Sequence, residues 1–284
     1  MLKKRRIDRC QRLKKWQNLP LMLMIEKITR HVVITRPSGP YAGGDKLAGK
    51  LRQAGFSTLE LPVLACRVIP LSDETKKLLQ EFYPVEKVWI AFLSPSALWV
   101  WSTVAASDAA LMALTKRALI AVQGSGTAAA CEECFGRRPD FIPSVFVAEE
   151  FAKEFALVSK PGQRVLVPQS AEGRDVFVPT VRRHGVIADG FGLYRLEPCE
   201  PSPESLLKFN NLQNEEPFVV FMSPSAVRAA VGVIGPVLFK MRIVSVGPIT
   251  SHAVREAGLT VWREAQEHSE EGVLQALLSD IAGH

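Results

Sequence analysis

The apolar residues of the chain gather in short runs, each followed by a segment with helical spacing. Residues 31–37 open with a β-branched run that ends at a proline, which predicts a buried strand. Residues 41–55 then place leucines at helical spacing and end at a glycine, a residue typical of the position after a helix. Residues 58–61 predict a second strand. This alternation of strand and helix is typical of an α/β protein with a parallel sheet.

The same order of elements recurs later in the chain. A strand at 164–168 is followed by a helix through Val176, Val178 and Val181, and then by a strand at 192–196. Residues 89–98 resemble 218–227, and residues 119–127 resemble 242–250. Residue 31 corresponds to 164, 92 to 221 and 124 to 247, so the separations are 133, 129 and 123 residues. We interpret this as a duplicated α/β unit that forms two domains.

Each repeated segment ends in a small polar turn that should begin a helix. Ser94-Pro95 and Ser223-Pro224 place a hydroxyl at the N-cap and proline at the first helical position. The turns 124–127 and 247–250 use glycine, which gives close access to the backbone. Such turns lie at the carboxyl ends of parallel strands, where α/β proteins bind ligands and where free N–H groups attract anions. The sequence thus favours a cleft for a ligand with several carboxylates or phosphates, although helix capping alone would also explain these residues.

The positive charge of the chain belongs to its first thirty residues. Residues 1–30 hold ten lysines and arginines against two acids, a net +8, whereas the whole chain carries +6 and residues 31–284 therefore −2. We expect no nucleic-acid partner for the body of the chain. The apolar stretch 19–25 is short, and no small-residue cleavage site follows it, so we expect an extension rather than a secretory signal or membrane anchor, with Met22 or Met24 as a natural start.

Several classes of chemistry lack their usual motifs. No Walker loop, dinucleotide fingerprint or nucleophile elbow is present, and the five histidines lie in separate segments. Cys131 and Cys134 form a lone C-x-x-C, which we interpret as part of a helix that ends at Gly136 rather than as a zinc or redox site. The five cysteines follow no disulfide pattern, so we expect a cytoplasmic protein. The remaining candidates are weak acids and hydrogen-bonding groups: Tyr194, Thr127, Thr250, Ser94 and Ser223.

Over residues 31–284 the sequence resembles the uroporphyrinogen-III synthase family. Six motifs occur in the order the family has them, and together they carry the resemblance: 33–37 (VITRP), 92–97 (FLSPSA), 122–128 (VQGSGTA), 193–195 (LYR), 221–226 (FMSPSA) and 246–250 (VGPIT). The turn 168–170 departs from the family, because it reads Pro-Gln-Ser where relatives often have Pro-Arg-Gly. That difference removes a positive charge and weakens the case for a carboxylate contact there.

The resemblance implies an α/β fold of two similar domains, each a parallel sheet flanked by helices, joined by a two-stranded connector. Residues 1–29 would be the basic extension, 30–63 and 200–284 the first domain, 72–187 the second, and 64–71 and 188–199 the connectors. It also implies a reaction: the linear tetrapyrrole hydroxymethylbilane is closed to uroporphyrinogen III, with inversion of the last ring and loss of water. No cofactor or metal is needed, because the pyrrole itself is the nucleophile, and the enzyme would be a cytoplasmic monomer with no membrane contact that receives its substrate from the upstream synthase.

The resemblance also assigns residues. Tyr194 matches the family's donor to the leaving hydroxyl, with packing on the connector as the alternative. Thr127 and Thr250 match its cleft threonines, and Arg36 would pair with an acetate or propionate arm or be an exposed structural arginine. The expected substrate-binding set is Thr127, Thr250, Ser94, Ser223, Arg36, Gly126 and Ser225.

Two other functions remain open at this point. A two-domain protein could bind a polyanionic small molecule without catalysis. A glycosyltransferase would also have two α/β domains, but it normally needs charged residues that read a sugar nucleotide, and none is evident. Tight nucleotide binding would favour the latter.

Overall fold

A parallel sheet forms the first of two lobes in the computed structural model, which describes residues 30–37, 46–173 and 175–279. Its strands are β1 (His31–Ile34), β2 (Ser57–Glu60), β8 (Phe218–Phe221), β9 (Arg242–Ser245) and β10 (Val261–Glu264). Its helices are α2 (Lys46–Gln53), α9 (Pro203–Leu212), α10 (Pro224–Ile234), α11 (Pro248–Glu256) and α12 (Glu270–Leu278), with 3-10 turns η2 (Gln213–Glu215) and η3 (Gly235–Lys240). The strands lie in the order β10, β9, β8, β1, β2, and all of them pair in parallel. These elements are the first lobe.

A second five-stranded sheet forms the second lobe. Its strands are β3 (Leu64–Val68), β4 (Val88–Phe92), β5 (Leu119–Val122), β6 (Arg164–Ser170) and β7 (Ile187–Pro198). Its helices are α3 (Asp73–Phe82), α4 (Pro95–Ala106), α5 (Ala109–Arg117), α6 (Ser125–Phe135), α7 (Ala148–Val158) and α8 (Phe177–Arg182). The order is β3, β7, β6, β4, β5, and only the β3–β7 pair among them is antiparallel. The predicted α/β fold of two similar sheet-and-helix domains is confirmed.

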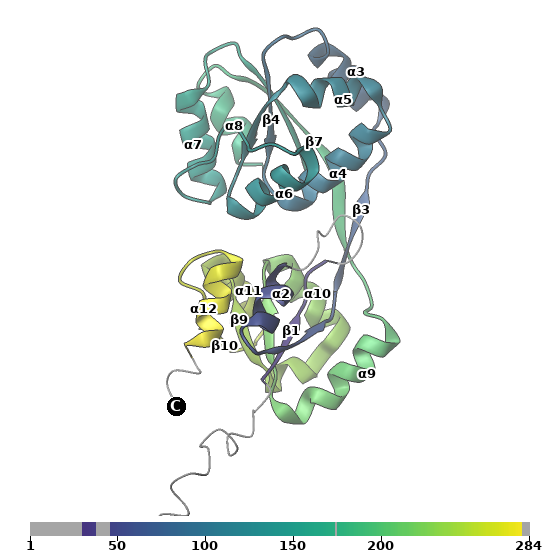
Figure 1. Cartoon of the computed structure of the whole chain (residues 1–284), viewed down its shortest axis with the longest axis vertical. Coiled ribbons are helices and arrows are strands. Elements are labelled where there is room, and N and C mark those ends of the chain that lie inside the picture. The colour runs from purple at the N-terminus through teal and green to yellow at the C-terminus, as the bar shows by residue number, and fades with distance from the viewer. Residues whose placement is uncertain (1–29, 38–45, 174, 280–284) are drawn as a thin grey trace, which may run out of the picture. The chain divides into compact units, whose positions relative to one another are not determined.

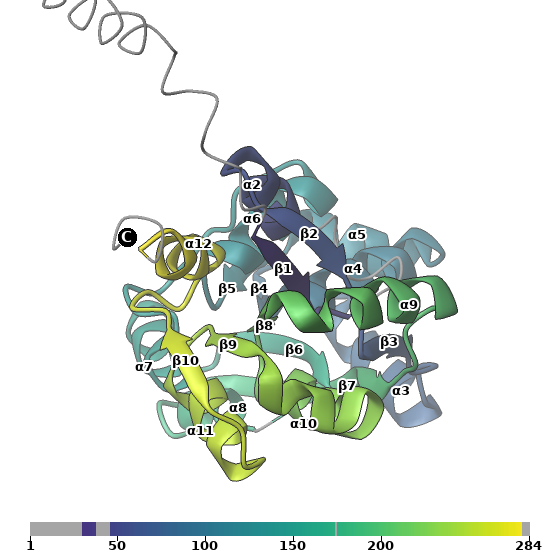
Figure 2. The same ribbon diagram turned by 90° about the horizontal axis from the view of Figure 1, so that it is seen from below.

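Alternate residues of each central strand enter different cores. In β1, Val33 packs with α10 and α11, whereas Val32 and Ile34 face α2 and α12. Figure 2 shows α10 and α11 on one side of this sheet and α2 and α12 on the other. In the second lobe, Ile90 and Trp89 of β4 likewise belong to opposite apolar clusters. A strand has a side-chain period of two, so helices on both faces require the near-continuous apolar runs seen in the sequence.

The strand β7 pairs with a different neighbour at each end. Residues from Ile187 to Gly192 pair in parallel with β6, and residues from Tyr194 to Pro198 pair antiparallel with β3. The two strands β3 and β7 run side by side in Figure 1. The segment 188–199, expected as a connector, therefore combines a sheet strand and an antiparallel ribbon in one continuous strand.

The sequence repeats occupy equivalent places in the two sheets. The matched segments are β1 with β6, β2 with β7, β4 with β8 and β5 with β9, and both sheets arrange them in the same spatial order. Several smaller predictions are also confirmed: the C-x-x-C lies within α6, which ends at the left-handed Gly136, and helices α2 and α8 occupy the segments expected for them. The residues 1–29 and 41–45, for which an extension and a helix start were predicted, lie outside the described part of the chain. None of the helices within the described ranges has the length and hydrophobicity needed to cross a membrane.

Candidate active site

Four helices, α4, α6, α10 and α11, begin directly after the strands β4, β5, β8 and β9. Ser94 caps α4 by accepting a hydrogen bond from the Ala97 N–H at 3.1 Å, and Ser223 caps α10 through the Ala226 N–H at 3.2 Å. At α6 and α11 the N-cap is Gly124 or Gly247, and neither makes a side-chain hydrogen bond. The predicted caps are confirmed. The first amides of α6 lack the side-chain acceptor that Ser94 gives to α4, which leaves them suited to an anionic ligand.

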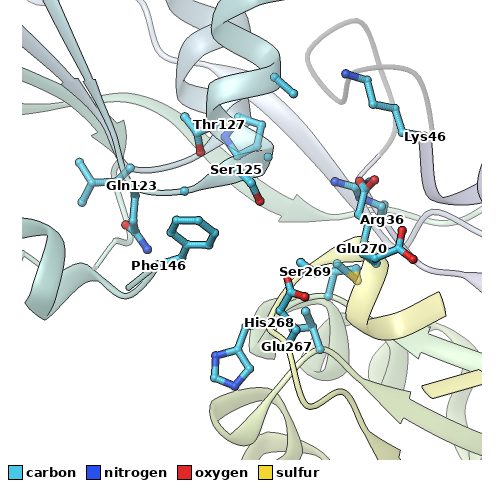
Figure 3. Close-up of a pocket in the computed structure, with 18 of the residues that line it drawn as sticks. Arg36, Lys46, Gln123, Ser125, Thr127, Phe146, Glu267, His268, Ser269 and Glu270 are labelled. Atoms are coloured by element: carbon cyan, nitrogen blue, oxygen red, sulfur yellow. The ribbon is translucent and has the colours of Figure 1, made fainter. Parts of the chain in front are cut away.

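A pocket of about 540 Å³ opens at the start of α6 (Figure 3). Its volume lies within the range of about 300–1,000 Å³ that is common for small-molecule sites. Its lining consists of Arg36, Lys46, Lys50, Leu93, Pro95, Trp99, Gln123, Gly124, Ser125, Gly126, Thr127, Ala129, Phe146, Met222, Val246, Glu267, His268, Ser269, Glu270 and Glu271. The pocket thus combines a glycine-capped helix start with charged side chains of both signs.

Each cation of the pocket pairs with a carboxylate of the protein. Arg36 Nη1 lies 2.5 Å from Glu270 Oε1, and both side chains are about three-quarters buried. Lys46 Nζ lies 2.6 Å from Glu133 Oε1, and Lys50 Nζ lies 3.5 Å from Glu271 Oε2. An anionic ligand must therefore compete with these acids for the side-chain cations, whereas the main-chain amides of α6 present no such competition.

Tyr194 is buried beside this pocket and bonded to a helix cap. Its side chain is 4% exposed, and its phenolic oxygen lies 2.8 Å from Ser94 Oγ, with either group able to donate. Burial raises the pKa of Tyr194 to about 12, which the hydrogen bond to Ser94 only partly offsets. The phenol therefore stays protonated at neutral pH and can act as a donor. The residues on either side of Ser94, Leu93 and Pro95, line the pocket.

The other expected site residues divide into two groups. Thr127, Gly126 and Arg36 line the pocket, and Thr127 is only 4% exposed. The described lining does not include Ser94, Tyr194, Ser223, Ser225 or Thr250. Ser223 Oγ lies 2.9 Å from Ser225 Oγ, and Thr250 is buried in α11. Met222, next to Ser223, and Val246, four residues before Thr250, do line the pocket, so the first lobe contributes residues close in sequence to those expected.

Sequence reasoning missed several residues of the pocket. Phe146 lies two residues before α7 begins and His268 two residues before α12, and a side chain at Gly124 or Gly247 would meet their rings. Residues 146 and 268 are 122 apart, close to the 123 that separates the two glycines. The repeat spacing could therefore have identified Phe146 and His268 as equivalent positions, although the two side chains differ in chemistry. No comparable pattern in the sequence pointed to the other charged residues of the pocket, which are Lys46, Lys50, Glu267, Glu270 and Glu271.

The cysteines of the described residues form no disulfide. Cys66, Cys131, Cys134 and Cys199 are free, and burial raises the pKa of the Cys131 thiol to about 11. Within the described ranges, no group of three or more His, Cys, Asp or Glu side chains is placed to hold a metal ion.

A family model described as "Uroporphyrinogen-III synthase HemD" matches residues 45–275. The chain belongs to the uroporphyrinogen-III synthase family. A protein of Methanocaldococcus jannaschii named "Putative uroporphyrinogen-III synthase" is 28% identical over 232 residues, which cover 80% of this chain and 89% of that protein. The resemblance inferred from the six motifs is thereby confirmed.

Two solved uroporphyrinogen-III synthase structures share the fold. The enzyme of Helicobacter pylori aligns with a TM-score of 0.58 at 17% identity, covering 88% of this chain and 99% of its own. A mutant of the enzyme of Thermus thermophilus aligns with a TM-score of 0.52 at 16% identity, covering 90% and 100%. Membership of the uroporphyrinogen-III synthase family implies a lyase that acts on the small molecule hydroxymethylbilane in tetrapyrrole synthesis.

Proposed function

We propose that this chain cyclises hydroxymethylbilane to uroporphyrinogen III, with inversion of the terminal pyrrole ring and loss of water. The observation that carries the proposal is the pocket at the start of α6, where a helix without a side-chain cap lies near the buried Tyr194 and its hydrogen-bond partner Ser94. The substrate is an octacarboxylate. The first amides of α6 suit one of its carboxylates, and the charged residues around them suit others after exchange with the protein's own acids.

The reaction requires the protein to donate hydrogen bonds to the leaving hydroxyl and to fix the geometry of ring closure. Loss of the terminal hydroxyl as water gives an electrophilic azafulvene, and a pyrrole carbon of the same molecule attacks it. We propose that Tyr194 and Ser94 assist the departure of the hydroxyl by hydrogen bonding to it, since the high pKa of Tyr194 keeps its proton in place. Most of the remaining effect would come from holding the two ends of the substrate together.

The other expected residues take binding roles in this proposal. Thr127 and Gly126 would contact one carboxylate at α6, and Thr250, Ser223 and Ser225 would contact others from the first lobe. Arg36 would bind an acetate or propionate arm after release from Glu270. No cofactor or metal enters the proposed reaction.

We also propose that the enzyme is a cytoplasmic monomer that supplies haem, sirohaem or cobalamin synthesis and receives its unstable substrate through transient contact with the upstream synthase. The free cysteines among the described residues accord with a reducing compartment. The domain division proposed with it is 30–63 and 200–284 for the first domain, 72–187 for the second, and 64–71 and 188–199 for the connectors.

The isomer composition of the product tests the function. Freshly prepared hydroxymethylbilane is incubated with the full chain, the products are oxidised to porphyrins, and the isomers are separated by chromatography. We expect the type III isomer, whereas a parallel incubation with heat-inactivated protein should give only the spontaneous type I product. Type I alone in both incubations would reject the proposal, and retention of unreacted substrate by the protein would favour a binding function.

A further inference from the structure

Phe146 is an aromatic residue that the fold holds in place but does not bury. It is 39% exposed, lines the pocket, and belongs to none of the four apolar clusters that the described residues form. In Figure 3 its ring lies next to the side chains of Gln123 and Ser125 at the start of α6. An aromatic face left open beside an anion-binding helix start is available to a ligand that is both aromatic and acidic.

The loop that carries Phe146 is anchored at several points. The Phe141 carbonyl accepts a hydrogen bond from the Val122 N–H at 3.0 Å, which ties the start of the loop to β5. In its middle, the Ser144 N–H and hydroxyl both donate to the Glu154 carboxylate of α7, at 2.9 Å and 2.5 Å. Those bonds hold the pKa of Glu154 below its ordinary value. The backbone of the loop before Phe146 is therefore fixed before any ligand arrives, which lowers the entropy lost on binding.

Gly124 provides the space that the ring occupies. Its φ is −172°, an extended value that any residue adopts, so backbone conformation does not require glycine at this position. A Cβ atom at Gly124 would lie 3.1 Å from Phe146 Cβ and 3.2 Å from Phe146 Cγ. Of the four helices that follow the repeated strands, α4 and α10 are capped by serine and α6 and α11 by glycine. The glycine at α6 thus replaces a capping hydroxyl with room for Phe146 against the helix start.

We propose that Phe146 is a positioning residue that stacks on one pyrrole ring of the substrate while a carboxylate arm of the same ring reaches the first amides of α6. This inference rests on the function proposed above. Aromatic pairs with offset or edge-to-face geometry gain affinity beyond the area they bury. At the equivalent place in the first lobe the residue is His268, so only the α6 side of the pocket offers a phenyl face. With phenylalanine beside the start of α6 and histidine beside the start of α11, the two sites would favour different pyrrole rings of the substrate.

Steady-state kinetics of Phe146→Leu, Phe146→Trp and Gly124→Ala test the proposal. Phe146→Leu keeps an apolar side chain but removes the aromatic face, and we expect KM for hydroxymethylbilane to rise about tenfold with kcat within about twofold. Phe146→Trp should restore KM to near the parent value. Gly124→Ala should raise KM in the same direction by displacing the ring, and its effect should largely vanish in the Phe146→Leu background.

Ile142→Ala is the matched control. Ile142 is an apolar residue of the same loop, 41% exposed and outside the pocket lining, so its removal should leave KM and kcat unchanged. Thermal melting of each variant identifies any loss of folded protein. The Gly124→Ala variant keeps Phe146 and changes only the position of its ring. If the parent chain forms type III product but Phe146→Leu leaves KM unchanged, the role of Phe146 is refuted and the function stands. If the parent forms only type I product, the function itself is refuted.

Discussion

Tyr194 lies at the residue of β7 where the strand changes partner. Its backbone pairs in parallel with Ser170 and antiparallel with Val68, and its carbonyl accepts a hydrogen bond from the Ala171 N–H at 2.8 Å. With backbone partners on both sides and the hydroxyl bonded to Ser94, the phenol has little freedom to reorient. A donor held in this way needs no rearrangement when charge develops on a substrate.

Burial of Tyr194 predicts a loss of stability in alkali. The pKa is raised from 10.0 to about 12, and the pKa values of the Cys66 and Cys131 thiols are raised from 9.0 to about 11. Each group loses its proton more readily in the unfolded chain, so the contribution of these three groups to the free energy of unfolding should be constant below about pH 9 and should fall from there to about pH 12.

The variant Tyr194→Phe isolates the tyrosine's share of this effect. Between about pH 10 and 12 its free energy of unfolding should fall less steeply than that of the parent, by up to about 1.4 kcal/mol per pH unit. Urea denaturation at intervals from about pH 8 to 12 measures both slopes. Parallel pH profiles for the two proteins would show that the phenol ionises equally well in the folded and unfolded states.

Only part of the site could be predicted at the level of residues. The caps Ser94 and Ser223 followed from local chemistry, because an N-cap bonds an amide three residues away. The contact of Ser94 with Tyr194 spans 100 residues of sequence, and that of Arg36 with Glu270 spans 234. No pattern in the neighbouring sequence indicates such distant partners. The sequence could therefore identify these side chains as candidates, but it could not show that Arg36 is already paired with Glu270.

At the level of elements, the start of α4 combines a structural and a proposed catalytic role. Ser94 Oγ accepts the Ala97 N–H and also contacts the Tyr194 hydroxyl. Ser72 caps α3 in the same lobe by accepting the Thr75 N–H at 3.1 Å. The two capping hydrogen bonds have the same length, 3.1 Å, and Ser72 lies outside the proposed site, which makes them a matched pair.

We predict that Ser94→Ala and Ser72→Ala differ in activity more than in stability. Each should lower the free energy of unfolding by about 1 kcal/mol through loss of the cap, with some further loss at Ser94 because the Tyr194 hydroxyl loses its partner. Ser94→Ala should slow formation of the type III isomer about tenfold or more, and Ser72→Ala should not. Chemical denaturation and isomer assays on both variants provide the comparison, and equal rates would remove the Ser94–Tyr194 pair from the reaction.

The repeated strands and the helices that directly follow them were largely predictable, whereas the full extent of β7 was not. Apolar period, glycine and proline located the central strands and the helices that follow them, because the signals for both are local. For β7 the sequence predicted a strand only at 192–196, since the pairing with β6 and β3 that extends it from Ile187 to Pro198 is set by tertiary structure.

At the level of the whole molecule, the apolar clusters follow the two sheets. The clusters around Val33 and Val32 contain the strands of the first sheet, and those around Ile90 and Trp89 contain the central strands of the second. Val219 and Val165 are fully buried in a first-lobe and a second-lobe cluster, respectively. The exceptions lie in the β3–β7 ribbon, where Leu64 belongs to the cluster around Val33 and Leu196 packs against a cluster of each lobe. Cores that are separate apart from this ribbon allow separate unfolding transitions.

Scanning calorimetry should show this independence. We expect a calorimetric enthalpy larger than the van't Hoff enthalpy, which indicates more than one cooperative unit. Val219→Ala and Val165→Ala should each cost about 2 kcal/mol and should lower the temperature of different components. One transition that both variants shift alike would mean that the lobes unfold as a single unit.

The two halves of the repeat are equivalent strand by strand: β1, β2, β4 and β5 correspond to β6, β7, β8 and β9. In sequence these are two tandem copies, yet the first sheet unites β1 and β2 of one copy with β8 and β9 of the other, and the second sheet unites the complementary halves. Each copy therefore contributes half of each sheet within one polypeptide, just as two chains exchange elements in a domain-swapped dimer. Neither copy alone contains a complete sheet, so a chain cut at the repeat boundary would yield fragments that reconstitute both lobes only by associating with each other.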